Sequence, residues 1–267
     1  IKSRIDDLHN AFKDKNINII SCARGGFNIN DLLPYIDWNI VKNNPKIICG
    51  YSDITALANA IYTKIGIVTY IGPNFSTFGI QKQSNYTFDF FKQCVMTTNP
   101  IQIIPSLKWG QKDGEKFNNK GFQVLQKGHV QGIVVGGNLC TLNLLQGTEY
   151  MPNLKDKVLF IEEDDYSKEL TPLEFERNLE SLLQSCNRQK IKGILIVVKN
   201  ILQYHWLREI LEYSNMFQEN EIGIVDNKNK HTYLENETSY VIIIPNHAPI
   251  LSTFIESNEQ NISKLKD

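Results

Sequence analysis

The sequence lacks both long apolar runs and an excess of basic side chains. Lys and Arg number 28 against 29 Asp and Glu, which gives a formal net charge of −1. The longest apolar segments, such as Gly132–Gly137 and Gly193–Val198, have only the length of a strand, whereas a membrane-spanning helix needs about 20 apolar residues. Binding to nucleic acid depends on Lys and Arg contacts with phosphate. We therefore expect neither a membrane protein nor a nucleic-acid-binding protein.

Cysteine is also scarce, and the few cysteines form no metal-binding or disulfide pattern. The chain has five, an odd number, and none belongs to a Cys-x-x-Cys pair. Most of them lie in apolar segments, which predicts buried free thiols in a reducing compartment, the cytoplasm. They are Cys22, Cys49, Cys94, Cys140 and Cys186.

The chain does contain a regular alternation of short apolar strands and amphipathic helices. The spacing of apolar residues predicts helices at Ser3–Lys13, with Ser3 as the N-cap, at Asp53–Lys64 and at Pro172–Ser185. Nearly continuous apolar strands between helices are typical of a parallel sheet that is covered on both faces. The predicted strands are Ile17–Cys22, Lys46–Gly50, Ile67–Ile71, Val130–Val135, Val158–Ile161, Ile191–Val198, Ile222–Val225 and Tyr240–Ile244.

This pattern predicts an α/β fold with two α/β domains. Residues 1–100 would form a Rossmann-like or flavodoxin-like domain, truncated at its start because the chain has no initiator Met and enters a helix almost at once. Residues 130–267 would form the second domain. The segment 101–129 is rich in Pro and Gly and predicts a linker or substrate loop. Within it, Trp109 is expected either to contact the substrate or to pack the loop onto the body of the protein.

The sharpest local motif is a buried strand that ends at Gly50-Tyr51-Ser52-Asp53, where a helix begins at once. A serine on such a turn would stand above the sheet, close to backbone N–H groups and the N-terminus of a helix, as a nucleophile elbow requires. The motif lacks the second glycine of the usual elbow. The alternative is that Ser52 or Asp53 caps the helix, which is the more common role of these residue types.

A serine nucleophile also needs a base and an acidic group that orients the base. Among the five histidines, His247 follows the end of a strand, where α/β proteins place their sites, and His231 lies in a polar run. Acidic side chains are concentrated at Glu162–Asp165, a cluster that could orient a histidine, bind a divalent metal or begin a solvated loop. A weaker indication of a phosphate loop, Gly136-Gly137-Asn138, lacks the Walker lysine.

Six motifs in this order resemble the LD-carboxypeptidase family of serine peptidases. The resemblance extends from about Ser3 to Ile196, and the segment Gln146–Pro152 is closer to the branch that includes the microcin C self-immunity proteins. The motifs are Ala23–Phe27, Asn44–Lys46, Gly50–Thr55, Gly72–Pro73, Gly136–Leu139 and Leu159–Glu162.

The resemblance implies a Ser-Glu-His triad on a cytoplasmic, homodimeric, two-domain scaffold that needs no metal and no cofactor. Ser52 matches the nucleophile of the family, and Glu162 matches the triad acid. The oxyanion hole would consist of the backbone N–H of Asp53 and one from the turn of Gly25 and Gly26, with Gly26 favoured. Family members also have a strand and a helix before the position of Ile1.

The triad base stays open between two histidines, because the family pattern ends near Ile196. His231 is followed by Thr232, as in the family, and lies at nearly the expected distance from Glu162. His247 has the better physical setting, at a strand end. We expect a serine carboxypeptidase that cleaves an amide bond near a free carboxylate, in a muropeptide or in a peptidyl or aminoacyl nucleotide. The alternative is a non-catalytic ligand-binding protein, or a family member without a functional triad histidine.

Overall fold

The structure is a computed structural model of the chain. It describes residues 1–79, 85–109, 117–119, 121–124, 128–163, 170–186, 191–198, 240–245 and 251–252. The strand predicted at Ile222–Val225 lies outside these residues.

The first sheet has four strands in the order β1-β2-β3-β11. Strands β1, β2 and β3 are parallel, and β11 adds to the edge in the antiparallel direction. Each parallel strand is followed by helical structure before the next, which is the crossover arrangement that parallel pairing requires. The strands in this order are Ile19–Ser21, Ile47–Gly50, Tyr70–Ile71 and Leu251–Ser252.

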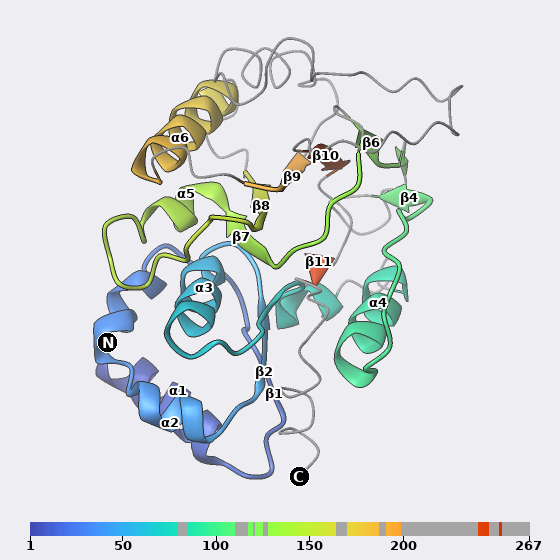
Figure 1. Cartoon of the computed structure of the whole chain (residues 1–267). Coiled ribbons are helices and arrows are strands. Elements are labelled where there is room, and N and C mark those ends of the chain that lie inside the picture. Colours follow the sequence, from blue (N-terminus) through green and yellow to red (C-terminus); the bar gives the residue numbers. More distant parts are fainter. Residues whose placement is uncertain are drawn as a thin grey trace.

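Helices and short 3₁₀ turns lie before, between and after the three parallel strands of the first sheet (Figure 1). Helix α1 packs its apolar side inward, and Phe12 is only 1% exposed. The prediction of Ser3 as its N-cap is wrong, because α1 begins one residue earlier and its N-cap, Ile1, makes no side-chain capping bond. The elements are α1 (Lys2–Lys13), η1 (Ile29–Tyr35), α2 (Trp38–Asn43), α3 (Ile54–Ile65) and η2 (Phe75–Gly79).

Helix α3 is buried over its first two turns, from Ile54 to Ile61. It contacts β2 and β3 of the first sheet as well as β7 and α5 of the second half of the chain. Three alanines in these turns, Ala56, Ala58 and Ala60, allow the neighbouring backbones to come close. The helix ends at Gly66, whose left-handed φ of 73° is a common way to end a helix.

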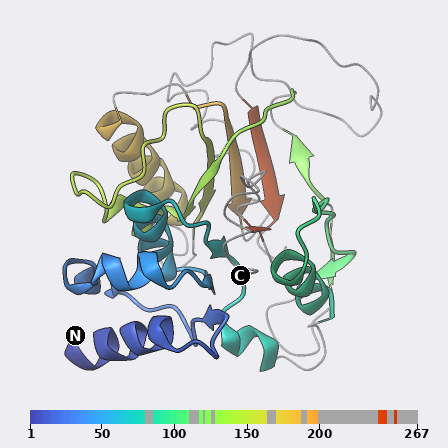
Figure 2. The same ribbon diagram turned by 60° about the horizontal axis from the view of Figure 1, so that its bottom comes forward.

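The second sheet has five strands in the order β6-β10-β9-β8-β7. Four strands are parallel, and β6 pairs with β10 in the antiparallel direction at the edge. Figure 2 shows α6 along one side of this sheet. The elements are β6 (Gln123–Val124), β7 (Val134–Asn138), α5 (Leu139–Asn143), β8 (Val158–Glu162), α6 (Thr171–Ser185), β9 (Gly193–Val198) and β10 (Tyr240–Pro245).

A helix and a small hairpin lie between the two sheets in the sequence. Helix α4 covers Asn85–Met96, and strands β4 (Lys108–Trp109) and β5 (Phe117–Asn118) pair in the antiparallel direction. The sequence predicts a linker or loop for the region of the hairpin. Two-residue strands carry no measurable alternation of polar and apolar residues, so the sequence pattern does not reveal them.

The two sheets share one continuous apolar core. Its buried members include Ile48 of β2, Leu57 of α3, Leu139 of α5 and Ile161 of β8. The predicted α/β class with parallel sheets is therefore confirmed. The division into residues 1–100, 101–129 and 130–267 stays a prediction. Strand pairing crosses it, because β6 lies within the second range and β11, from the third, pairs with β3.

All five cysteines are free thiols, but they are not all buried. Cys49, Cys94 and Cys186 are buried, Cys22 is partly buried, and Cys140 is exposed. The prediction of a buried thiol is therefore wrong for Cys140, which lies on the outer side of the short helix α5. Among the residues whose structure is described, none of the helices has the length and apolar character that a bilayer crossing requires.

Candidate active site

Ser52 lies in the turn between strand β2 and helix α3, at the carboxyl edge of the first sheet. Its φ is 64°, in the left-handed region, and its side chain is partly buried. A residue with a Cβ atom costs about 1–2 kcal/mol in this conformation. A strained serine between a strand and a helix is the geometry of a nucleophile elbow. The structure thus supplies the local backbone shape that the sequence motif indicates.

Asp53 occupies the N-cap position of α3, but its side chain makes no capping hydrogen bond. Its Oδ2 instead accepts hydrogen bonds from the backbone N–H of Asn28 at 3.2 Å and of Ile29 at 3.1 Å. The residue is 4% exposed. The capping interpretation of Asp53 is therefore wrong, because its side chain binds a segment 24–25 residues away.

Burial raises the pKa of the Asp53 carboxyl above its ordinary value of 3.8. The two backbone N–H bonds and the positive charge of Arg4 oppose this rise, and the negative charge of Asp31 adds to it. Removal from water is the largest of these effects and disfavours the charged form.

The glycine turn, defined here as Gly25 and Gly26, lies directly against the Ser52 turn. A Cβ atom on Gly25 would stand 2.9 Å from Ser52 Cβ and 3.1 Å from Ser52 Oγ. A Cβ on Gly26 would stand 3.0 Å from Asp53 Oδ2. These spaces are too small for a side chain without movement of the neighbours. The structure therefore brings together all four of the predicted residues Gly25, Gly26, Ser52 and Asp53.

Asn74 is a further polar residue beside the Ser52 turn, and the sequence analysis missed it. It follows Gly72-Pro73 at the end of β3 and is 3% exposed. Its Oδ1 accepts a hydrogen bond of 3.3 Å from the backbone N–H of Tyr51. The sequence signal that could have indicated it is an Asn directly after a Gly-Pro pair at a strand end, since Asn side chains in turns commonly bind nearby backbone.

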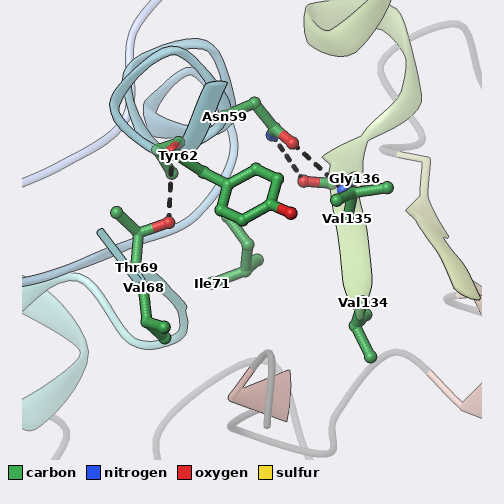
Figure 3. Close-up of a pocket in the computed structure, with 9 residues that line it drawn as sticks. Asn59, Tyr62, Val68, Thr69, Ile71, Val134, Val135 and Gly136 are labelled. Atoms are coloured by element: carbon green, nitrogen blue, oxygen red, sulfur yellow. Dashed lines mark hydrogen bonds between the residues drawn. The ribbon is translucent and has the colours of Figure 1, made fainter. Parts of the chain in front are cut away.

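Helix α3 is hydrogen-bonded to strand β7 at two points, which we call the α3–β7 junction. Figure 3 shows the first point, between Asn59 and Gly136. Asn59 bonds both backbone groups of Gly136: its Nδ2 donates to the carbonyl at 2.7 Å, and its Oδ1 accepts from the N–H at 3.2 Å. One turn earlier, Thr55 Oγ1 accepts from the N–H of Asn138 at 2.9 Å. The carboxyl end of β7 therefore lies beside the N-terminal end of α3.

The two glycines of β7 explain how the helix comes so close. Gly136 and Gly137 have φ values of 127° and 135°, which side chains rarely adopt. A Cβ on Gly137 would lie 2.5 Å from Thr55 Oγ1. These glycines thus serve the contact between helix and strand, a role different from the phosphate loop considered from the sequence.

Glu162 is the last residue of β8 and is partly buried. In the sheet it pairs with Asn138, which in turn is bonded to Thr55. It also lies on the same face of β8 as Phe160, because side chains alternate along a strand. Phe160 packs with Ala58 and Ile71 of the first half of the chain. The acid thus lies at the carboxyl end of β8, next to Asn138, which contacts α3 through Thr55.

The other acids of the predicted cluster are placed differently or are not described. Glu163 is 9% exposed and follows the end of β8. Asp164 and Asp165 lie outside the described residues. Within the described part of the chain, no group of three or more His, Cys, Asp or Glu side chains is arranged to hold a metal ion.

Both candidates for the base, His231 and His247, lie outside the described residues. The backbone of Trp109 forms part of β4, while its side chain is not described. The proposed roles of these residues stay predictions. Of the other histidines, His9 has a contact within the fold, since its Nε2 accepts the backbone N–H of Asp37 at 2.9 Å.

A small pocket lies beside the α3–β7 junction, farther along α3 from Ser52 (Figure 3). Its walls are largely apolar, and the hydroxyl of Thr69 donates to the carbonyl of Ala58. None of the predicted catalytic residues lines it. The lining residues are Ala58, Asn59, Tyr62, Val68, Thr69, Ile71, Val134, Val135 and Gly136.

Two family models match this chain. The family model for the LD-carboxypeptidase N-terminal domain matches residues 1–72, and the model for the LD-carboxypeptidase C-terminal domain matches residues 131–224. The chain belongs to the LD-carboxypeptidase family. The family prediction made from the six sequence motifs is therefore confirmed.

Two individual proteins show how far this similarity extends. The protein named putative carboxypeptidase YocD, from Bacillus subtilis, is 47% identical over 203 residues, which cover 73% of this chain and 62% of YocD. The crystal structure of an MccF-like protein from Bacillus anthracis has a TM-score of 0.80 at 38% identity, covering 97% of this chain and 79% of that chain. The chain spans about six-tenths of the length of two curated relatives that it matches, YocD and a putative carboxypeptidase from Treponema pallidum.

Two further relatives have names that state a ligand or substrate. The microcin C7 self-immunity protein MccF in complex with aspartyl sulfamoyl adenosine has a TM-score of 0.69 at 26% identity, covering 91% of this chain and 71% of that chain. Murein tetrapeptide carboxypeptidase from Pseudomonas aeruginosa is 28% identical over 149 residues, which cover 55% of this chain and 46% of that enzyme.

Proposed function

We propose that this LD-carboxypeptidase family member is a serine hydrolase that uses Ser52 as its nucleophile. The observation that carries the proposal is the left-handed backbone of Ser52 between β2 and α3, with the glycine turn in contact with its side chain. A position that costs stability in this way is retained where the local geometry serves function.

Glu162 is the proposed triad acid. The α3–β7 junction supports this assignment, because it sets the carboxyl ends of β7 and β8 beside the start of α3. Two residues of a strand and one turn of a helix both cover about 6 Å. From Asn59 back to Thr55 the helix therefore covers the same distance as the strand from Gly136 to Asn138. Ser52 lies directly before this turn of the helix, and its carbonyl accepts the N–H of Thr55.

The proposed reaction follows from these groups. His231 or His247 takes the proton of Ser52 Oγ, the serine oxygen attacks the amide carbonyl, and the backbone N–H groups of Asp53 and Gly26 stabilise the oxyanion. The protonated histidine then gives its proton to the leaving amine. Water attacks the acyl enzyme and releases the free acid and Ser52. Glu162 orients the histidine and stabilises its charged form.

The proposed substrates are compounds with an amide bond near a free carboxylate. The names of relatives support two kinds, murein peptides and aminoacyl nucleotides. The cytoplasmic location, the homodimer and the contact of Trp109 with substrate remain predictions from the sequence.

The decisive experiment compares the parent chain with Ser52→Ala on a murein tetrapeptide and on aspartyl sulfamoyl adenosine. We expect the parent chain to hydrolyse at least one compound and Ser52→Ala to lose on the order of 10⁶-fold in kcat, as removal of a serine nucleophile does. Ser76→Ala is the matched control, since Ser76 lies in the neighbouring 3₁₀ helix η2 and its backbone N–H donates to the carbonyl of Ala23.

Replacement of each histidine by alanine then identifies the base. One of His231→Ala and His247→Ala should be inactive and the other active. An active Ser52→Ala variant would exclude the serine mechanism. If the parent chain hydrolyses neither compound while a full-length relative hydrolyses one, the non-catalytic alternative replaces the enzyme.

A further inference from the structure

The glycine turn is anchored at both of its ends, by different kinds of bond. Before the turn, the carbonyls of Cys22 and Ala23 accept hydrogen bonds from the backbone N–H groups of Phe75 and Ser76, at 2.8 Å and 3.2 Å. After the turn, the backbone N–H groups of Asn28 and Ile29 donate to one side chain, the Asp53 carboxylate. The first anchor is backbone to backbone, whereas the second joins two backbone N–H groups to one carboxylate, and Arg4 adds a side-chain bond of 3.1 Å from its Nη1 to Asn28 Oδ1.

We propose that the Asp53 carboxylate is a positioning residue that holds the glycine turn at a fixed distance from Ser52. The proposal rests on the proposed function, in which the turn supplies one N–H of the oxyanion hole. Asp53 does not need to touch the substrate for this role. Its side chain acts through the backbone of residues 26–29, while its own backbone follows Ser52 directly.

The contact distances support this role. Asp53 Oδ2 would stand 3.0 Å from a Cβ on Gly26, so the carboxylate lies immediately behind the turn. On the other side, the turn lies against the Cβ and Oγ of Ser52. One carboxylate oxygen therefore fixes the spacing between the proposed nucleophile and the backbone that would stabilise the oxyanion. A displacement of about 1 Å at this point would misalign the N–H donor and can cost about 100-fold in rate.

The charge of Asp53 supports the same conclusion. The carboxylate is buried, and among the described residues no cation lies within ion-pair distance of it. Arg4 acts on it only through a longer-range charge effect. Two N–H bonds and the nearby helix N-terminus stabilise the anion. A neutral residue such as Ser or Asn could cap the first N–H groups of α3 without the free-energy cost of burying a charge. The carboxylate is therefore better explained by its bonds to residues 28 and 29.

The test uses Asp53→Ala and Asp53→Asn in the full chain, with the substrate that the parent chain hydrolyses. Asp53→Ala removes the acceptor, and we expect kcat to fall about 100-fold, as for loss of an oxyanion donor, while KM changes less than about threefold. Asp53→Asn keeps an acceptor oxygen and should retain kcat within about tenfold. Asp37→Ala is the matched control, since Asp37 also accepts a backbone N–H, that of Asn39, but away from the site.

Amide hydrogen exchange gives a readout that does not depend on activity. In Asp53→Ala the amides of Asn28 and Ile29 should lose protection at least about tenfold, and in Asp53→Asn they should keep it. The inference is wrong if either the protection of both amides or the kcat is unchanged in Asp53→Ala. If the parent chain is inactive, the proposed function fails, and the exchange result alone decides whether the carboxylate holds the turn.

Discussion

Helix α3 meets glycine-containing backbone at two places, and the two contacts differ in how they are stabilised. At the α3–β7 junction, the neutral side chains of Thr55 and Asn59 satisfy backbone groups of Gly136 and Asn138. At the Ser52 turn, a buried carboxylate faces the glycine turn, and a serine adopts a left-handed backbone. Glycine thus allows a close approach of two backbone segments at both places, but different kinds of side chain stabilise the two contacts.

The α3–β7 junction and the Ser52 turn contribute to the stability of the fold with opposite signs. Each neutral hydrogen bond at the junction contributes about 1 kcal/mol to stability. The left-handed conformation of Ser52 costs about 1–2 kcal/mol, and burial of the Asp53 charge adds a further cost. The comparison teaches that the junction stabilises the fold, whereas the Ser52 turn is maintained at the expense of stability. Three predictions test this difference.

The largest expected effect is on activity, from Gly25→Ala. The added methyl group would stand 2.9 Å from Ser52 Cβ, so it must displace either the nucleophile or the turn. We expect kcat/KM to fall on the order of 10²–10³-fold, with a loss of less than about 1 kcal/mol in the free energy of unfolding, because the turn is exposed. Steady-state kinetics and urea unfolding measure the two quantities.

Gly79→Ala serves as the control for Gly25→Ala, because no atom of the described residues lies within 4 Å of a Cβ at that exposed position. It should leave both quantities unchanged. A Gly25→Ala variant with activity within tenfold of the parent chain would contradict the placement of the glycine turn against the nucleophile.

The second prediction concerns stability, from Gly137→Ala at the junction. This change adds a methyl group 2.5 Å from Thr55 Oγ1 at a residue with a φ of 135°. Overpacking and backbone strain together should lower the free energy of unfolding by about 3 kcal/mol or more. Gly147→Ala is the matched control, because Gly147 also has a positive φ, 73°, but in the part of the chain that the structure describes nothing lies within 4 Å of a Cβ there.

Gly147→Ala should cost only about 1 kcal/mol, the strain of the left-handed conformation. Urea denaturation of both variants makes the comparison. Equal losses in the free energy of unfolding for the two variants would mean that the close contact between α3 and β7 does not require a glycine at position 137.

The smallest effect is the pH dependence that Asp53 adds to stability. Burial raises the pKa of Asp53 in the folded protein, so the folded state binds this proton more tightly than the unfolded state. The contribution of Asp53 to stability therefore decreases as pH rises from the ordinary value of 3.8 through the raised pKa, and it stays low above that pKa.

The measurement is the difference in unfolding free energy between the parent chain and Asp53→Asn, followed from about pH 4 to about pH 8. Asp53→Asn should gain stability relative to the parent chain as pH rises. A constant difference would mean that burial does not disfavour the charge at the Ser52 turn.

Much of the fold could be predicted from local sequence patterns. The helix predicted at Asp53–Lys64 is α3, and the strand predicted at Val158–Ile161 is β8 with one more residue. Apolar periodicity indicates these elements because each one buries a defined face. The Ser52 turn was also visible, since a strand, a glycine and a helix follow one another within a few residues.

The sequence by itself determined the α/β class, the family and the position of the Ser52 turn, because each depends on neighbouring residues in the chain. Only the tertiary structure decided what the polar side chains of α3 bind. Asn59 meets Gly136 across 77 residues, and Asp53 meets Ile29 across 24. Such partners depend on how the two sheets pack around the helix. No local pattern indicates that packing, so the sequence left capping open as an alternative for Asp53 and could not show that its side chain bonds residues 28 and 29.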